Sequence, residues 1–80
     1  MHKQAFTVTH NNNSYSIAKR KLPWRGQHGD ATDVVLRDSN KWGQYIAFYV
    51  TCNNKSPEPG RCYCVHYYIN DGEVSYFTVN

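Results

Sequence analysis

The sequence predicts a mainly β protein, with a single small antiparallel sheet or a partly open barrel of five to six strands. Two observations carry this prediction. Short runs of alternating apolar and polar residues recur along the chain, and Asn, Gly or Pro residues bound them. The apolar content is also rich in rings, with seven Tyr, three Phe and two Trp, and aromatic residues are enriched in strands.

The first two strands are predicted to form a hairpin around three consecutive Asn residues. Residues 5–10 alternate with the period of two that is typical of a half-buried strand. Asn tolerates left-handed backbone conformations, so residues 11–13 fit a loop, and the alternation resumes over residues 14–21. Pro23 ends the second strand because it has no N–H to donate.

The middle of the chain fits two structures. Residues 24–32 follow neither period and are predicted to form a long loop, a usual place for functional residues. Residues 34–36 have the composition of a short buried strand, but Asp30 could also cap a helical turn. We favour the strand, and the alternative is an α+β fold with one short helix near residues 31–38.

Three further strands complete the predicted fold. Residues 44–52 are rich in β-branched and aromatic side chains and are predicted to form the central strand. An exposed connection rich in Pro and Gly follows. Residues 62–70 and 73–79 are then predicted to form a hairpin, because Asp71–Gly72 between them is a strong two-residue turn signal.

That hairpin implies a register. A two-residue turn at Asp71–Gly72 places Tyr67 directly opposite Tyr76 on the face that is expected to meet the core. The opposite face then carries His66, Tyr68 and Phe77, a mixed set of rings that is less suited to full burial.

The length and composition limit the class of protein. Eighty residues suffice for one domain, residues 1–80, and bury too little surface for a deep substrate pocket. No stretch approaches the roughly 20 apolar residues that span a bilayer, and the first residues do not form a signal-peptide core. We therefore expect a cytoplasmic protein with no membrane partner, or else a processed chain whose leader is missing. The cysteine count is three, an odd number that favours reduced thiols over a disulfide framework, with one bridge and one free thiol as the alternative.

Basic residues are concentrated in the N-terminal third. Residues 1–28 carry five basic residues and no acid, whereas residues 29–80 carry four basic and six acidic residues. This asymmetry indicates either an anionic partner for that third or a solvated loop. Adjacent Trp and Arg residues in a predicted loop are also typical of binding hot spots. The predicted binding residues are Lys19, Arg20, Lys21, Trp24 and Arg25, with His66, Tyr68 and Phe77 as a secondary binding face.

A zinc site is the sharpest chemical hypothesis, although the spacing disfavours it. Cys62, Cys64 and His66 fall on one strand face, and Cys52 ends the preceding strand. Residues two apart on a strand are about 6.6 Å apart, so Cys62 and His66 are about 13 Å apart. The ligands of one zinc ion must lie within about 4 Å of each other. We therefore expect no metal and no cofactor.

No arrangement of residues predicts catalysis. A nucleophilic Cys64 needs a neighbouring base, and the strand spacing predicts that His66 is too far away for a hydrogen bond. A small ribonuclease-like toxin would use residues such as His66, Arg61 and Glu73, but nothing in the sequence positions them together. We expect a non-enzymatic protein.

The sequence thus favours a small binding protein. The favoured partner is another protein, as for the accessory or inhibitor proteins of phages and mobile elements. The first alternative is a module for single-stranded nucleic acid, in which the basic N-terminal third contacts phosphates and Trp24, Tyr68 and Phe77 stack on bases. The second alternative is the ribonuclease-like toxin. The sequence does not indicate an oligomeric state.

Overall fold

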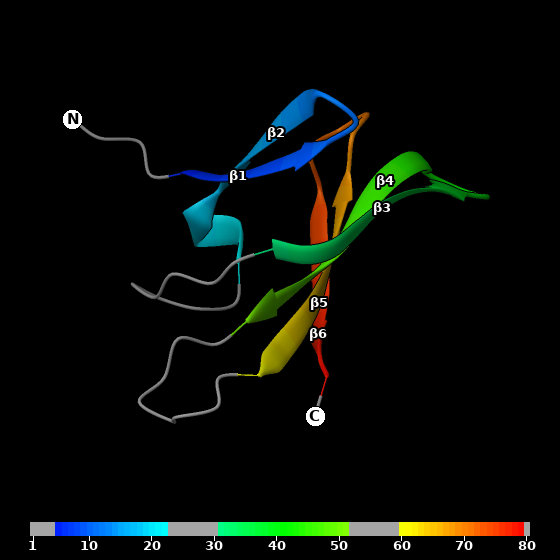
Figure 1. The fold of residues 1–80 in the computed structure, drawn as a ribbon. Helices are drawn as coiled ribbons and strands as arrows, with labels where there is room; N and C mark the ends of the chain where they lie inside the picture. The colour runs from blue at the N-terminus through cyan, green and yellow to red at the C-terminus, as the bar shows by residue number, and fades with distance from the viewer. Residues whose placement is uncertain (1–4, 23–30, 52–59, 80) are drawn as a thin grey trace.

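The computed structural model describes residues 5–22, 31–51 and 60–79 of the chain. These residues form two antiparallel sheets (Figure 1). Strands β1 and β2 make a two-stranded sheet, and β3, β4, β5 and β6 make a four-stranded sheet in chain order. A short 3-10 helix, η1, follows β2. The elements are β1 (Ala5–His10), β2 (Asn13–Ala18), η1 (Lys19–Lys21), β3 (Ala31–Ser39), β4 (Gly43–Thr51), β5 (Arg61–Tyr68) and β6 (Val74–Thr78).

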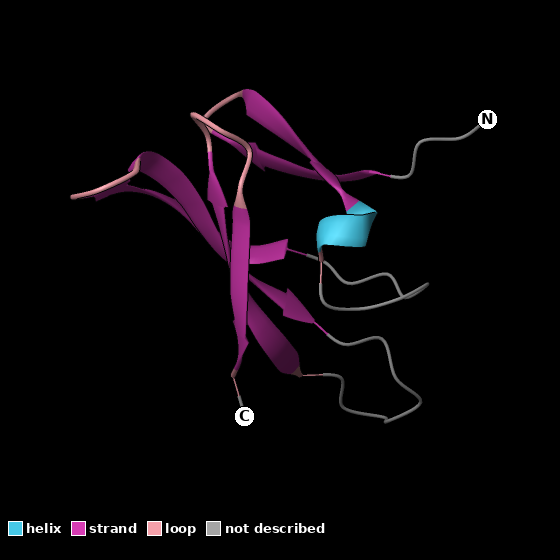
Figure 2. Ribbon diagram, turned by 180° about the vertical axis from the view of Figure 1, so that it is seen from behind, coloured by secondary structure: helices cyan, strands magenta, loops and turns pink. Residues whose placement is uncertain are grey.

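The predicted mainly β class is confirmed, and the strand predicted for residues 34–36 lies within β3, where the alternative had placed a helix near residues 31–38. The described residues contain no α-helix and form no closed barrel. The six strands form two sheets, because the β1–β2 hairpin packs across one face of the four-stranded sheet instead of extending it (Figures 1 and 2). The second strand also ends earlier than predicted, since residues 19–21 turn into η1.

The core lies between the two sheets. Val8 and Ile17 of the hairpin are buried against Phe48 and Val65 of the four-stranded sheet. Aromatic contacts also join the two layers, with ring centroids 6.0 Å apart for Phe6 and Phe48. We call the side of the four-stranded sheet that meets the hairpin the inner face. The remaining buried members of this cluster are Leu22, Ile46 and Val50.

Local backbone features shape the two ends of β3. Near its start the pairing with β4 shifts between Thr32 and Val35, and Asp33 adopts a positive φ of 54°. This β-bulge bends the strand. At the other end, the Ser39 hydroxyl accepts hydrogen bonds from the backbone N–H groups of Lys41 and Trp42, both at 3.1 Å. The turn that results leads directly into β4.

The last hairpin differs from its predicted register. Tyr67 pairs with Val74, and Tyr76 pairs with Val65, so the predicted pairing of Tyr67 with Tyr76 is wrong by two residues. The cause is a longer loop over residues 69–72, since the carbonyl of Tyr68 accepts from the N–H of Gly72 and the N–H of Tyr68 donates to the carbonyl of Glu73, both at 2.8 Å.

A shift of two residues keeps each side chain on its predicted face, because side chains alternate with a period of two. Tyr67 and Val65 therefore still meet the core cluster. The placement of His66, Tyr68 and Phe77 on the other face is likewise unchanged.

Candidate binding surface

The side of the four-stranded sheet away from the hairpin is uncovered in the described part of the chain (Figure 2). On β4, Ile46, Phe48 and Val50 are buried on the inner face, so Tyr45 and Tyr49 point to the opposite side. Strand pairing extends this set to the neighbouring strands. We call the whole set the outer face, and it comprises Val35, Arg37, Tyr45, Ala47, Tyr49, Cys64, His66, Tyr68, Ser75 and Phe77.

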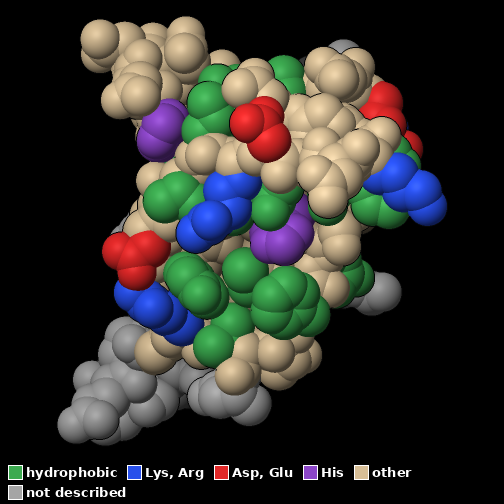
Figure 3. Space-filling model, turned by 90° about the vertical axis from the view of Figure 1, so that its right-hand side faces the viewer, with side chains coloured by type: hydrophobic (Ala, Val, Ile, Leu, Met, Phe, Trp, Pro, Cys, Tyr) green, Lys and Arg blue, Asp and Glu red, His purple; other side chains and the backbone are tan. Residues whose placement is uncertain are grey.

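Rings form a continuous row across the outer face. The ring of Tyr45 lies 4.8 Å from the His66 ring and 5.1 Å from the Tyr68 ring, centroid to centroid. On the far side of His66, the ring of Phe77 lies edge-on at 5.9 Å. Phe77 is 54% exposed. The row therefore presents aromatic surface to solvent in the centre of the sheet, and a space-filling view shows hydrophobic side chains gathered around a histidine (Figure 3).

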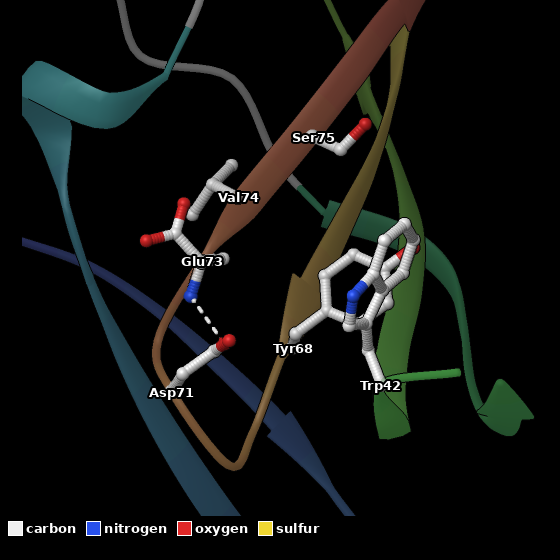
Figure 4. Close-up of a pocket in the computed structure, with 6 residues that line it drawn as sticks. All are labelled: Trp42, Tyr68, Asp71, Glu73, Val74 and Ser75. Atoms are coloured by element: carbon white, nitrogen blue, oxygen red, sulfur yellow. Dashed lines mark hydrogen bonds between the residues drawn. The ribbon is translucent and has the colours of Figure 1, made fainter.

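The row continues into a pocket at one end of the sheet. The indole of Trp42 meets the ring of Tyr68 edge-on at 5.6 Å, and Trp42 is 55% exposed. The carboxylate of Asp71 accepts a hydrogen bond from the backbone N–H of Glu73 at 3.1 Å, which fixes the facing loop (Figure 4). The pocket is about 330 Å³ in volume and is lined by Trp42, Tyr68, Asp71, Glu73, Val74 and Ser75.

A second hollow of about 370 Å³ lies over the middle of the outer face, between β3 and β6. Arg61 borders this region, pairs with the Asp33 carboxylate and stacks over the ring of Tyr49 with its guanidinium carbon 4.5 Å from the centroid. The bulge at Asp33 and the register shift between Val50 and Thr51 bring the paired groups together from β3 and β5. Arg37 also lines the hollow.

Cys64 and His66 are in contact, contrary to the prediction that they are too far apart. The Sγ of Cys64 lies 3.7 Å from Nε2 of His66, because the two side chains lean toward each other from the same strand face. Burial raises the pKa of the Cys64 thiol. Burial, and secondarily the charge of Arg37, lowers the pKa of His66. Both shifts favour a neutral thiol beside a neutral imidazole, which is the opposite of an activated thiolate.

The residues of the ribonuclease-like hypothesis are not brought together. Arg61 and His66 lie five positions apart on β5, a separation of about 16 Å along a strand, and Arg61 pairs with Asp33. Glu73 lies beyond the end of β5, in the pocket with Trp42. Among the described residues, neither hollow therefore brings Arg61, His66 and Glu73 together.

The four candidate zinc ligands are not available together. Cys62 is disulfide-bonded, which differs from the expectation of reduced thiols, while Cys64 is free and buried. Cys52 lies outside the described residues. Where the structure describes the chain, no three Cys, His, Asp or Glu side chains gather as metal ligands would.

The basic N-terminal segment and the aromatic row lie on different sides of the four-stranded sheet. Lys19, Arg20 and Lys21 form η1, and the next residue, Leu22, is buried in the inner-face core. The ammonium of Lys21 donates a hydrogen bond to the carbonyl of Gly72 at 3.1 Å. Trp24 and Arg25 lie outside the described residues, so their part of the predicted binding surface stays a prediction.

The secondary binding face is the part of the predicted site that the structure assembles. His66, Tyr68 and Phe77 share the outer face, and their binding role stays a prediction. Sequence reasoning missed Tyr45, which joins them. A signal for it exists in β4, where Tyr45, Ala47 and Tyr49 alternate with the buried Ile46, Phe48 and Val50, so that neither face of the strand carries a charge.

Comparisons with protein-family models, with curated proteins and with solved structures find no match. Among the described residues, no helix has the length and apolar character needed to cross a membrane.

Proposed function

We propose that this chain is a non-enzymatic binding protein that recognises a protein partner through the outer face. The observation that carries this proposal is the row of rings made by Trp42, Tyr68, Tyr45, His66 and Phe77, which is exposed at its two ends and half-buried between them. Tyr, Trp and Arg are the residue types most enriched in binding hot spots, and such anchors cluster near the centre of an interface.

The charges on the outer face favour a particular kind of partner surface. The charge of Arg61 is balanced by the Asp33 carboxylate, whereas the charge of Arg37 acts on His66 and lowers its pKa. A partner that places a carboxylate on Arg37 and apolar side chains on the surrounding rings would match both features. We therefore propose a protein partner with an acidic residue at the centre of an apolar patch.

Single-stranded nucleic acid is the less favoured occupant. Binding of that kind combines stacking rings with a series of cations along the phosphate backbone. The three cations of η1 lie on the inner side of the sheet, away from Tyr68 and Phe77. The basic helix and the rings therefore do not form one continuous track in the described part of the chain.

The proposal is tested by affinity capture from an extract of the source cells, followed by binding measurements with the purified captured protein. Replacing Phe77 by Ala is expected to weaken that binding about tenfold, and replacing Arg37 by Glu to weaken it more, because the like charge repels an acidic partner. Leu36→Ala is the matched control, since Leu36 is exposed on the same sheet but points to the inner side.

Three results would count against this function. Equal losses for Leu36→Ala and Phe77→Ala would mean that the outer face is not the binding surface. Loss of binding in Trp24→Ala together with Arg25→Ala, with the outer-face variants unchanged, would move the surface to the N-terminal segment. Oligonucleotide binding that falls steeply with salt and depends on Tyr68 would establish the nucleic-acid alternative.

A further inference from the structure

Strand β6 is an edge strand of the four-stranded sheet. One side of it pairs with β5, and no strand of the described chain pairs with the other side. An open edge is a template for another strand, because it offers unpaired N–H and C=O groups in a regular row.

Hydrogen bonds at the two ends of β6 show which of its residues face β5. The carbonyl of Glu73 accepts a bond from the N–H of Tyr68 at 2.8 Å, and the N–H of Val79 donates to the carbonyl of Cys62 at 2.9 Å. The bonding direction alternates along an antiparallel strand. The odd-numbered residues of β6 therefore direct their backbone groups toward β5.

The even-numbered residues direct their backbone groups to the open edge. These are Val74, Tyr76 and Thr78, spaced evenly about Tyr76. The pairing of β6 contains no register shift. The open edge thus offers a regular pattern that is symmetric about its middle residue.

This edge lacks the features that usually block strand addition. Natural edges are protected by charges, by Pro or by bulges, and residues 74–79 contain no charged residue and no Pro. The opposite edge of the same sheet, β3, has two of these protective features. It carries the charged residues Asp33, Arg37 and Asp38, and a bulge interrupts it. The two edges therefore differ in how strongly they resist pairing.

We propose that β6 pairs with β6 of a second copy of this chain, antiparallel, about a two-fold axis through Tyr76. This register sets Tyr76 opposite Tyr76 and Val74 opposite Thr78, and it pairs every outward-facing backbone group of both strands. An axis through Ser75 or Phe77 would leave one outward-facing residue of each strand without a partner. The pairing is independent of the function proposed above.

The side chains agree with this register. Tyr76 is 47% exposed and packs edge-on against Tyr63 of its own sheet, with centroids 6.1 Å apart. Across the axis it meets Tyr76 of the second copy, and aromatic cross-strand pairs stabilise sheets. On the outer face, Phe77 meets the small Ser75 of the second copy. No two like charges face each other, because Glu73 falls opposite Val79.

Sedimentation analysis of the purified chain tests this pairing. A five-residue edge buries little surface, so we expect a monomer–dimer equilibrium with a dissociation constant on the order of 100 µM. Tyr76→Lys and Tyr76→Glu should each be monomeric, because the axis sets each new charge directly opposite its own copy. An equimolar mixture of these two variants should form dimers again, since Lys then faces Glu.

Two controls keep the test independent of folding. Thr7→Lys adds the same charge on β1, far from the edge, and should dimerise like the unmodified chain. Amide hydrogen exchange of the unmodified chain should slow about tenfold at Val74, Tyr76 and Thr78 when the dimer is about 90% populated, with little change at Ser75 and Phe77.

Other outcomes would overturn the proposal. A chain that stays monomeric up to about 1 mM has no such pairing, because the expected dissociation constant lies well below that concentration. Failure of the mixed Lys and Glu variants to associate would exclude an axis at Tyr76. Concentration-dependent protection on β3 or β1 instead of β6 would place the contact on another edge.

Discussion

The rings of Tyr45 and His66 lie 4.8 Å apart on the outer face, although the two residues are not direct cross-strand partners. Tyr45 pairs with Tyr68, and His66 pairs with Ala47, so the contact runs diagonally across β4 and β5. The small side chain of Ala47 leaves room above it for the ring of Tyr45. His66 is thereby partly withdrawn from water at the centre of an otherwise open face.

This placement predicts a pH dependence of stability. Burial, and then Arg37, lowers the pKa of His66 below its ordinary value of 6.5. The folded chain then binds fewer protons at this site than the unfolded chain. The stability associated with neutral His66 is present above pH 6.5 and is lost as the pH falls through 6.5 toward the folded value.

We expect the Tm of the chain to fall between about pH 7.5 and about pH 5, and His66→Gln to reduce that fall. Arg37→Gln should reduce it less, since Arg37 is the smaller of the two causes. Scanning calorimetry at several pH values measures all three proteins. An identical pH dependence in the His66→Gln variant would contradict this account of the site.

Asp33 predicts a difference between two substitutions that both remove its carboxylate. Its pair with Arg61 is exposed, with 48% and 58% of the Arg61 and Asp33 side chains accessible, so the pair itself contributes less than about 1 kcal/mol. The positive φ of 54° at Asp33 disfavours a residue with a Cβ. Asp33→Gly should therefore be more stable than Asp33→Ala by about 1 kcal/mol in urea unfolding. Equal stabilities would show that the bulge relaxes when the carboxylate is removed.

Phe48 predicts the largest single loss of stability. Its side chain is 1% exposed and stacks with Phe6, so it joins the two layers. Phe48→Ala is expected to lower the free energy of unfolding by about 3–5 kcal/mol. Trp42→Ala removes a larger but exposed ring, and it should cost less than about 1 kcal/mol. Urea titrations followed by circular dichroism measure the free energy of unfolding of both variants. Similar losses of stability would mean that Trp42 is part of the core.

Substitutions of two glycines by Ala are expected to distinguish the cost of backbone strain from the cost of a steric clash. Gly43 and Gly72 have φ values of 81° and 74°, so Ala at either position should cost about 1–2 kcal/mol. A Cβ on Gly43 would also lie 2.5 Å from Nδ2 of Asn70, whereas one on Gly72 meets nothing within 4 Å. Gly43→Ala should therefore be only slightly the more destabilising, because the exposed Asn70 side chain can move aside, and Asn70→Ala should remove this small excess. An excess that persists in the double variant would assign it to the backbone of the turn.

The strands were predictable because their signal is local. Alternation over residues 5–10 and the β-rich composition of residues 44–52 depend on neighbouring positions only. The faces of the last hairpin were also predictable, although its register was wrong, because an error of two residues leaves every side chain on its face. The loop itself was misjudged because the hairpin closes at Tyr68 and Glu73, so that residues 69–72 form the turn in place of the two-residue turn at Asp71–Gly72.

The candidate surface was only partly predictable. His66, Tyr68 and Phe77 come from one hairpin, so their shared face follows from alternation. Tyr45 joins them through the register of a different pair of strands. The pairing of Arg61 with Asp33 depends on two irregularities in separate ladders. Such contacts require the three-dimensional arrangement, because the first depends on the register between two strands and the second on where strands depart from regular pairing.

The chain order of the four-stranded sheet has a consequence for folding kinetics. Each of its pairings joins strands that are neighbours in the sequence, from β3 through β6. Its hairpins can therefore close one after another, on the microsecond to millisecond scale of local β-structure. The β1–β2 hairpin must instead find the inner face across the intervening chain. Docking of that hairpin is then the slow step, and substitutions at Val8 or Ile17 should change the unfolding rate more than the rate at which the four strands first assemble.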